Sequence, residues 1–77
     1  MRIPVRLHNR LRTLLPPEAQ GRTELDLPEG STLRDVLEAL DIELRYPAAV
    51  NGAIEADLDR VLGEGETVAV FAPIGGG

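Results

Sequence analysis

The chain has 77 residues and no cysteine, so neither a disulfide framework nor a thiolate-bound metal can hold its fold together. A chain of this length forms one domain and buries only about 60% of its unfolded surface. Most of its Val, Ile and Leu side chains must therefore share one core. We expect a single domain over residues 1–77, with residues 72–77 as a flexible glycine-rich tail. The missing cysteines also favour a cytoplasmic location.

Residues 2–8 have an apolar side chain at every second position, and residues 22–27 place Thr23, Leu25 and Leu27 on one face, which predicts two strands with one buried face. Pro4 removes one ladder donor from the first strand. Between the two strands, residues 9–15 have leucines three and four positions apart. This spacing predicts a short helix or helical turn, which Pro16-Pro17 ends.

The clearest helix signal begins at Ser31 or Thr32, either of which is a good N-cap. Asp35 stands three residues after Thr32 and gives a weaker form of the capping box. We expect this helix to end near residues 40–44. Its predicted apolar face consists of Leu33, Val36, Leu37 and Leu40.

The second half of the chain has a strong hairpin signal at Asn51-Gly52 and a β-branched run at residues 67–71 that is typical of a central strand. Residues between them, with Leu58, Val61 and Leu62, predict a turn that covers the core. The order of these elements predicts an α+β roll: a mixed sheet of about four to five strands packed on one main helix.

The formal net charge is -5 and is unevenly distributed. Residues 1–22 hold five arginines and one acid, whereas residues 23–77 hold three arginines and twelve acids. An acidic surface with few aromatic side chains disfavours nucleic acid as a partner, and no apolar stretch is long enough to span a membrane. A basic protein surface is the expected complement.

The sequence closes on Ala72-Pro73-Ile74-Gly75-Gly76-Gly77, in which three glycines have much backbone freedom to lose and nothing to pack. A recognisable pattern leads up to these residues. It comprises Val50-Asn51-Gly52, Leu62, Gly65-Glu66-Thr67-Val68, Phe71, Pro73, Ile74 and Gly76-Gly77, together with the helix entry at residues 27–37. In this order and spacing the chain resembles, over essentially its whole length, the MoaD/ThiS family of ubiquitin-like, β-grasp sulfur carriers.

This resemblance implies a carrier rather than an enzyme. An E1-like adenylyltransferase would use ATP and Mg to adenylate the Gly77 carboxylate, and a sulfur donor protein would then convert it to a thiocarboxylate. Gly75 and Gly76 would give access to a narrow active site, because glycine permits close backbone approach. No cofactor or metal is expected on the chain itself. The stretch from Phe71 to Ile74 is closer to MoaD than to ThiS.

The resemblance leaves the recipient of the sulfur open. Molybdopterin synthase, with its large subunit as partner, is the first candidate, and thiazole synthase of the thiamine pathway is the second. A ubiquitin-like modifier conjugated to lysines through Gly77, and a binding module that makes no use of the glycines, are further alternatives. The connection between the helix and Val50 is shorter than is usual for a molybdopterin synthase subunit.

Phe71, Pro73 and Ile74 are the predicted partner-binding residues beside the glycines. For Phe71, packing in the core and exposure at an interface are equally open. The single histidine, His8, ends the first strand without a nearby catalytic constellation and is interpreted as a surface residue. An acidic stretch, Glu55, Asp57 and Asp59, lacks the glycine and closing glutamate of a calcium loop and is interpreted as solvated.

Overall fold

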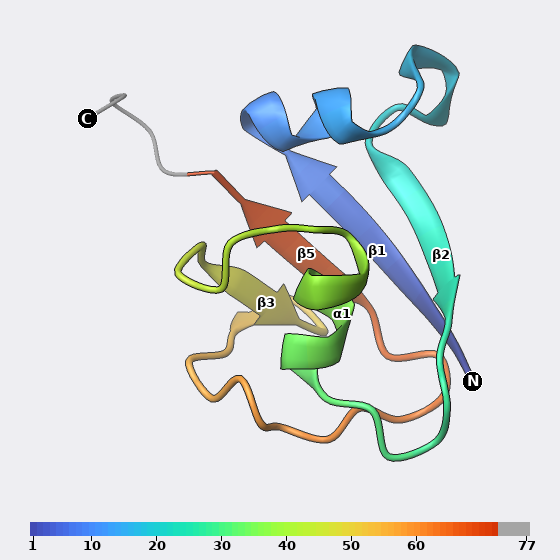
Figure 1. Ribbon diagram of the computed structural model, residues 1–77, viewed down its shortest axis with the longest axis vertical. Coiled ribbons are helices and arrows are strands. Elements are labelled where there is room, and N and C mark those ends of the chain that lie inside the picture. Colours follow the sequence, from blue (N-terminus) through green and yellow to red (C-terminus); the bar gives the residue numbers. More distant parts are fainter. Residues whose placement is uncertain (73–77) are drawn as a thin grey trace.

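The computed structural model describes residues 1–72, which form one mixed sheet with a single α-helix across one of its faces (Figure 1). No helix in this part of the chain is long and apolar enough to cross a membrane. The predicted roll of four to five strands on one main helix is confirmed. In chain order the elements are β1 (Arg2–His8), the 3₁₀ helices η1 (Asn9–Leu14) and η2 (Pro17–Ala19), β2 (Arg22–Asp26), α1 (Leu33–Ala39), β3 (Ala48–Val50), β4 (Ala53–Ile54) and β5 (Val68–Phe71).

The strands lie in the order β2-β1-β5-β3-β4, so β5 occupies the middle of the sheet, as its β-branched composition predicts. β1 pairs with β2 in antiparallel register, with Ile3 opposite Leu25. It pairs in parallel with β5, with Val5 opposite Val68. A parallel neighbour requires a crossover connection, and the chain that includes α1 provides it.

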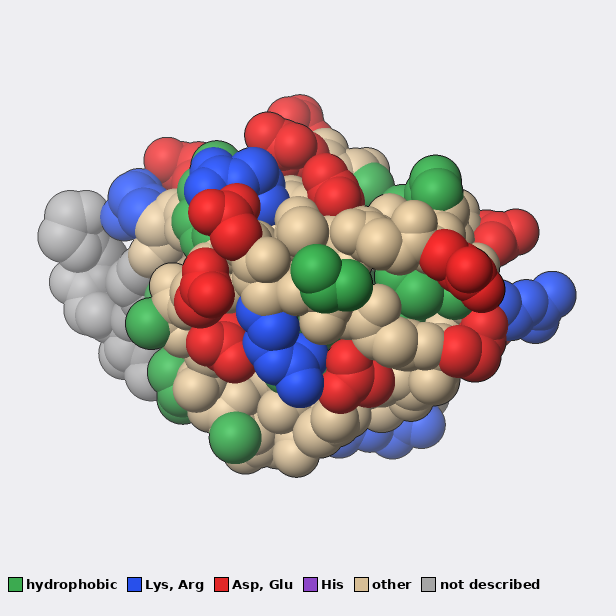
Figure 2. All heavy atoms as spheres, turned by 90° about the horizontal axis from the view of Figure 1, so that it is seen from below, with side chains coloured by type: hydrophobic (Ala, Val, Ile, Leu, Met, Phe, Trp, Pro, Cys, Tyr) green, Lys and Arg blue, Asp and Glu red, His purple; other side chains and the backbone are tan. Residues whose placement is uncertain are grey.

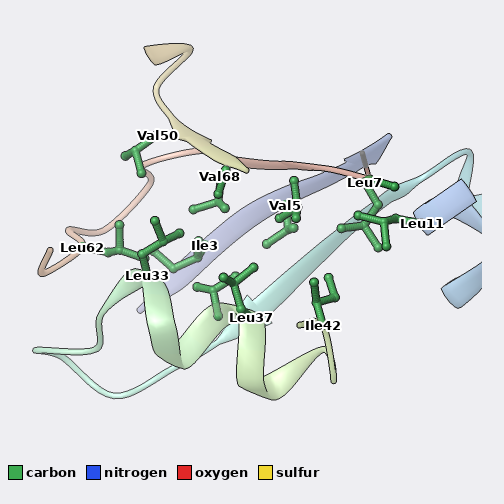
Figure 3. Packing of buried hydrophobic residues seen from close by; sticks show 14 residues of the cluster. Ile3, Val5, Leu7, Leu11, Leu33, Leu37, Ile42, Val50, Leu62 and Val68 are labelled. Atoms are coloured by element: carbon green, nitrogen blue, oxygen red, sulfur yellow. The ribbon is translucent and has the colours of Figure 1, made fainter. Parts of the chain in front are cut away.

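The core lies between the sheet and α1, where side chains from both layers interlock (Figure 3). Alternation along β1 turns Ile3, Val5 and Leu7 toward the helix with exposures of 2% or less. Full burial of each such side chain contributes about 1.5–3 kcal/mol. The core side chains that meet them from α1 are Leu33, Val36 and Leu37, each 0% exposed.

The boundaries of α1 follow from its caps. The Thr32 hydroxyl accepts a hydrogen bond from the Asp35 backbone N–H, and the Asp35 carboxylate accepts one from the Thr32 N–H at 2.8 Å, so the predicted capping box is present. The helix ends at Ala39, before the predicted 40–44. Asp41 adopts a left-handed φ of 58°, and the Ile42 N–H then donates to the Leu37 carbonyl at 2.9 Å.

Residues 61 and 62 correct one expectation about the core. Leu62 is 3% exposed, but Val61, which we predicted to cover the core beside it, is 60% exposed. Val61 forms an isolated bridge with Thr32, and the Leu62 N–H donates to the Ser31 carbonyl at 2.9 Å. Because extended chain turns successive side chains to opposite sides, only one of the two can face inward.

The Asn51-Gly52 hairpin is confirmed, with positive φ angles of 52° and 85° at its two turn residues. The Glu66 carboxylate ties this hairpin to the turn before β5. It accepts hydrogen bonds from the Asn51 amide at 2.9 Å, the Arg60 guanidinium at 3.1 Å and the Gly63 N–H at 2.7 Å. The Arg60 hydrogen bond, helped by that from Gly63, holds the pKa of Glu66 below its usual range.

Candidate functional site

The predicted site lies where β5 ends, and the structure reaches its first part only. Phe71 ends the strand and Ala72 follows it. The remaining predicted residues, Pro73, Ile74, Gly75, Gly76 and Gly77, lie outside the described residues, and their roles stay predictions.

The start of the predicted tail is anchored on two sides. The Phe71 N–H donates to the Pro47 carbonyl at 3.0 Å, which extends the pairing of β5 with the β3 side of the sheet. Ala72 is 3% exposed, and its carbonyl accepts a hydrogen bond from the Asn9 side-chain amide at 3.1 Å. Ala72, the first residue of the expected tail, thus packs in the core. The expectation of a flexible tail over residues 72–77 stays a prediction, because residues 73–77 lie outside the described residues.

Phe71 lies on the sheet face away from α1, stacked on His8. The two rings are 4.6 Å apart between centroids with an interplanar angle of 12°. They meet because His8 is the register partner of Phe71 in the parallel β1–β5 pair. Both residues are half-buried, so Phe71 is neither a core residue nor a free anchor. His8, interpreted from the sequence as a surface residue, is partly exposed on this face and also supports the last side chain of β5.

A second aromatic cluster flanks the end of β5 on the other side. Tyr46 precedes Pro47, and two guanidinium groups lie near its ring, those of Arg10 at 6.0 Å and Arg45 at 4.9 Å from the ring centroid. Arg10 also donates to the Tyr46 hydroxyl at 3.2 Å. No local sequence pattern predicts this cluster, because residues 10 and 46 are brought together only by the strand order.

Arg45 is itself paired with Glu43, at 3.1 Å between guanidinium Nε and carboxylate oxygen. The hydrogen bond from Arg45 is the main reason why the pKa of Glu43 is lowered, and the same bond raises the pKa of Arg45. Both side chains are well exposed, so the pair orders the loop before β3 rather than contributing much stability. Its effect is to keep Arg45 over the Tyr46 ring.

Acidic side chains are numerous at one end of the molecule, where arginines lie among them (Figure 2). The loops between β2 and α1 and between β4 and β5 lie at the end opposite the exit of β5, and acidic side chains are spread over that end (Figures 1 and 2). The exit of β5 has Arg10 and Arg45 beside it instead. The basic partner surface that we expected from the net charge therefore complements the loop end. A partner that binds at the end of β5 contacts Arg10 and Arg45 instead.

Among residues 1–72, no group of three or more His, Asp or Glu side chains is arranged to hold a metal ion. The acidic stretch after β4 uses its carboxylates locally. The Glu55 carboxylate accepts from the Asp57 N–H at 3.1 Å, and the Asp57 carboxylate accepts from the Asp59 N–H at 2.9 Å. These contacts form turns in the loop before β5.

Comparison with known proteins identifies a family and several proteins that this chain is similar to. A sequence model described as "ThiS family" matches residues 5–77. Protein RnfH of Cereibacter sphaeroides is 36% identical over 66 residues, which cover 75% of this chain and 76% of RnfH.

Two similar solved structures extend the comparison. A Pyrococcus furiosus protein assigned as molybdopterin converting factor, subunit 1, is 26% identical, with a TM-score of 0.76, over 96% of this chain and 99% of its own. Small archaeal modifier protein 1 of H. volcanii is 18% identical, with a TM-score of 0.76, over 95% of this chain and 98% of its own. These neighbours are ubiquitin-like β-grasp proteins, so the predicted fold class is confirmed.

Proposed function

Because the chain belongs to the ThiS family of small ubiquitin-like proteins and shares its fold with a MoaD-like solved structure, we propose that it is a sulfur carrier that works through the Gly77 carboxylate. One observation carries the proposal: the family match extends to residue 77 and so includes the three glycines. The chain acts as a protein cosubstrate, and the catalytic groups belong to its partners. Its cytoplasmic location stays a prediction.

The chemistry requires activation, because a carboxylate anion resists attack by a nucleophile. A Gly77 carboxylate oxygen attacks the α-phosphorus of ATP in an E1-like adenylyltransferase, and pyrophosphate leaves with Mg. A sulfide equivalent from a sulfur donor protein then attacks the carbonyl carbon of the mixed anhydride, and AMP leaves. The product is a C-terminal thiocarboxylate, which delivers its sulfur to a biosynthetic precursor.

The anchored end of β5 supports this role. Ala72 is buried and hydrogen-bonded, so the residues after it start from a fixed point in the middle of the sheet. A fixed starting point lowers the entropy cost of presenting a chain end to an active site. Gly75 and Gly76 carry no side chains that would collide with the walls of a narrow channel.

For the acceptor we favour a molybdopterin synthase, with its large subunit as partner, over thiazole synthase. The support is the solved P. furiosus protein assigned as subunit 1 of molybdopterin converting factor, which is 26% identical to this chain. Co-expression with each candidate partner, followed by purification through the partner, separates the two. A stable complex with thiazole synthase alone would reverse this preference.

The decisive experiment measures the intact mass of the protein after incubation with ATP, Mg, a sulfur donor and an activating enzyme encoded in the same genome. Replacement of oxygen by sulfur adds about 16 Da. A chain that lacks Gly76-Gly77 is the matched control and should keep its mass. If the full chain also keeps its mass with every such enzyme, the carrier proposal is wrong. Covalent adducts to other proteins in cells, lost from the same truncated chain, would identify a modifier instead.

A further inference from the structure

The sheet face opposite α1 carries one row of side chains that crosses all five strands. Register pairing connects Arg6 to Arg22 on one side and to Ala69 on the other. The row continues from Ala69 to Ala49 and ends at Ile54. Its composition changes along its length, from two guanidinium groups through two small alanines to an aliphatic side chain that is 69% exposed.

A hollow of about 710 Å³ lies over the basic half of this face. Its floor is low because Pro4 and Ala69 are small, and taller side chains from β1 and β2 surround them. The lining includes Arg6, His8, Arg22 and Glu24. The hollow therefore has room for side chains of another molecule against the sheet.

The two arginines in the hollow repel each other. Arg6 and Arg22 stand directly opposite across the antiparallel β1–β2 pair, an arrangement that destabilises a sheet when the charges are alike. Within residues 1–72 neither guanidinium takes part in a hydrogen bond or an ion pair. The nearby Glu24 carboxylate is instead 3.4 Å from the guanidinium of Arg2. A carboxylate placed between Arg6 and Arg22 would remove this repulsion.

Within residues 1–72, four of the eight arginines have no carboxylate partner: Arg6, Arg10, Arg12 and Arg22. Among these four, Arg6 and Arg22 stand directly opposite each other across a strand pair. Three of the other arginines each have a carboxylate within 3.3 Å: Arg34 with Asp59, Arg45 with Glu43, and Arg60 with both Glu55 and Glu66. A protein with thirteen acidic residues thus leaves two adjacent arginines on the open sheet face without one. A partner surface that complements this face is therefore acidic, even though the chain itself carries a net negative charge.

The hollow also extends toward the end of β5. His8 lines it, and His8 stacks on Phe71, which directly precedes the buried Ala72. A molecule seated in the hollow therefore contacts His8, the residue on which the last side chain of β5 is stacked. One partner could therefore contact both the hollow and the end of β5.

We propose that the open sheet face docks an acidic segment of the activating enzyme, with its carboxylates between Arg6 and Arg22 and an aliphatic side chain across Ala69 toward Ile54. This inference rests on the proposed function for the identity of the partner. Complementary charge fixes orientation and speeds encounter, so the face acts on binding and leaves the chemical step to the enzyme.

Charge reversal tests the proposal with the activating enzyme that adds about 16 Da to the wild-type chain. Arg6→Glu and Arg22→Glu should each raise the KM for the carrier about tenfold or more, with kcat within about twofold, because the reacting carboxylate is untouched. The matched control is Arg34→Glu on α1, which makes the same charge change on the opposite face and should leave KM within about twofold. Circular dichroism confirms that each variant is folded.

Salt dependence gives a second readout of the same contact. The KM of the wild-type chain should rise between low and high NaCl, and the KM of Arg22→Glu should rise much less, because the attraction that salt screens is gone. Equal KM values for Arg22→Glu and Arg34→Glu, or an equal salt dependence in wild type and Arg22→Glu, would overturn the proposal.

If no enzyme activates the chain, the carrier function is refuted but the docking face is not. A peptide titration then tests the docking face by itself. The probes are two peptides of equal length, one alternating Glu with Leu and one alternating Lys with Leu, added to ¹⁵N-labelled protein. We expect the acidic peptide to shift the amide signals of Arg6, Arg22 and Ala69, and the basic peptide to leave them unchanged. No shift at millimolar acidic peptide, or shifts confined to α1, would contradict the docking face.

Discussion

Replacing Gly21 with alanine should destabilise the fold more than the same change at any glycine in an open turn. Gly21 has a φ of +76°, and a Cβ built on it would lie 2.6 Å from the Leu7 carbonyl oxygen. Leu7 belongs to β1, in the sheet interior, so its backbone cannot move aside. The backbone at position 21 must therefore shift to remove the clash. This shift weakens the hydrogen bond that the Gly21 carbonyl accepts from the Leu7 N–H.

The cost has two parts. The left-handed conformation costs an L-residue about 1–2 kcal/mol. Weakening the hydrogen bond between Leu7 and Gly21 adds about 0.5–1.5 kcal/mol. Gly21→Ala should therefore lower the free energy of unfolding by about 1.5–3.5 kcal/mol. Gly30→Ala is the control, because Gly30 has a φ of +89° and nothing within 4 Å of its added Cβ, so it carries only the first part.

Urea unfolding followed by far-ultraviolet circular dichroism measures both variants, since the chain has no tryptophan to report by fluorescence. The expected difference between Gly21→Ala and Gly30→Ala is about 0.5–1.5 kcal/mol, the contribution of the lost hydrogen bond. Any entropy change of the unfolded chain is common to both variants and cancels. If Gly21→Ala is no less stable than Gly30→Ala, the close approach of Gly21 to β1 does not constrain the fold as we infer.

Three further predictions concern the core, the Glu66 network and the predicted reactive end. Leu37→Ala should lower the free energy of unfolding by about 2–5 kcal/mol in the same urea assay, because Leu37 is 0% exposed, and a loss below 1 kcal/mol would contradict its place in the core. Because the folded pKa of Glu66 is lowered, its contribution is present above the unfolded pKa and is lost as pH falls through the folded pKa. The stability difference between wild type and Glu66→Gln should thus be largest near neutral pH and shrink below about pH 4.5, and a pH-independent difference would count against the network. Gly76→Leu should abolish the gain of about 16 Da without changing the urea midpoint, whereas full conversion would argue against a narrow channel.

Local signals predicted the elements well, and the reasons are visible in particular residues. The capping box of Thr32 and Asp35 and the Asn51-Gly52 turn are encoded within a few consecutive positions, so both could be predicted. The early end of α1 could not, because it depends on Asp41 adopting a left-handed conformation that glycine usually supplies.

The surroundings of the site depend on contacts between distant segments and were largely beyond prediction. Phe71 was identified as a candidate, but its partner His8 is set by the parallel register of β1 with β5. Likewise, the period-two pattern places Arg6 and Arg22 on solvent-facing positions of two strands, and only the observed register makes them direct neighbours. Pairing between strands far apart in sequence carries no short-range signal.

The parallel pairing of β1 with β5 also determines how the domain bears mechanical load. A pull between the start of β1 and the end of β5 drives the two strands past each other in shear, so their ladder hydrogen bonds are strained together rather than opened one at a time. An enzyme that pulls on the residues after Ala72 therefore loads a strand that is paired on both sides. The chain end can be pulled into position while the domain behind it stays intact.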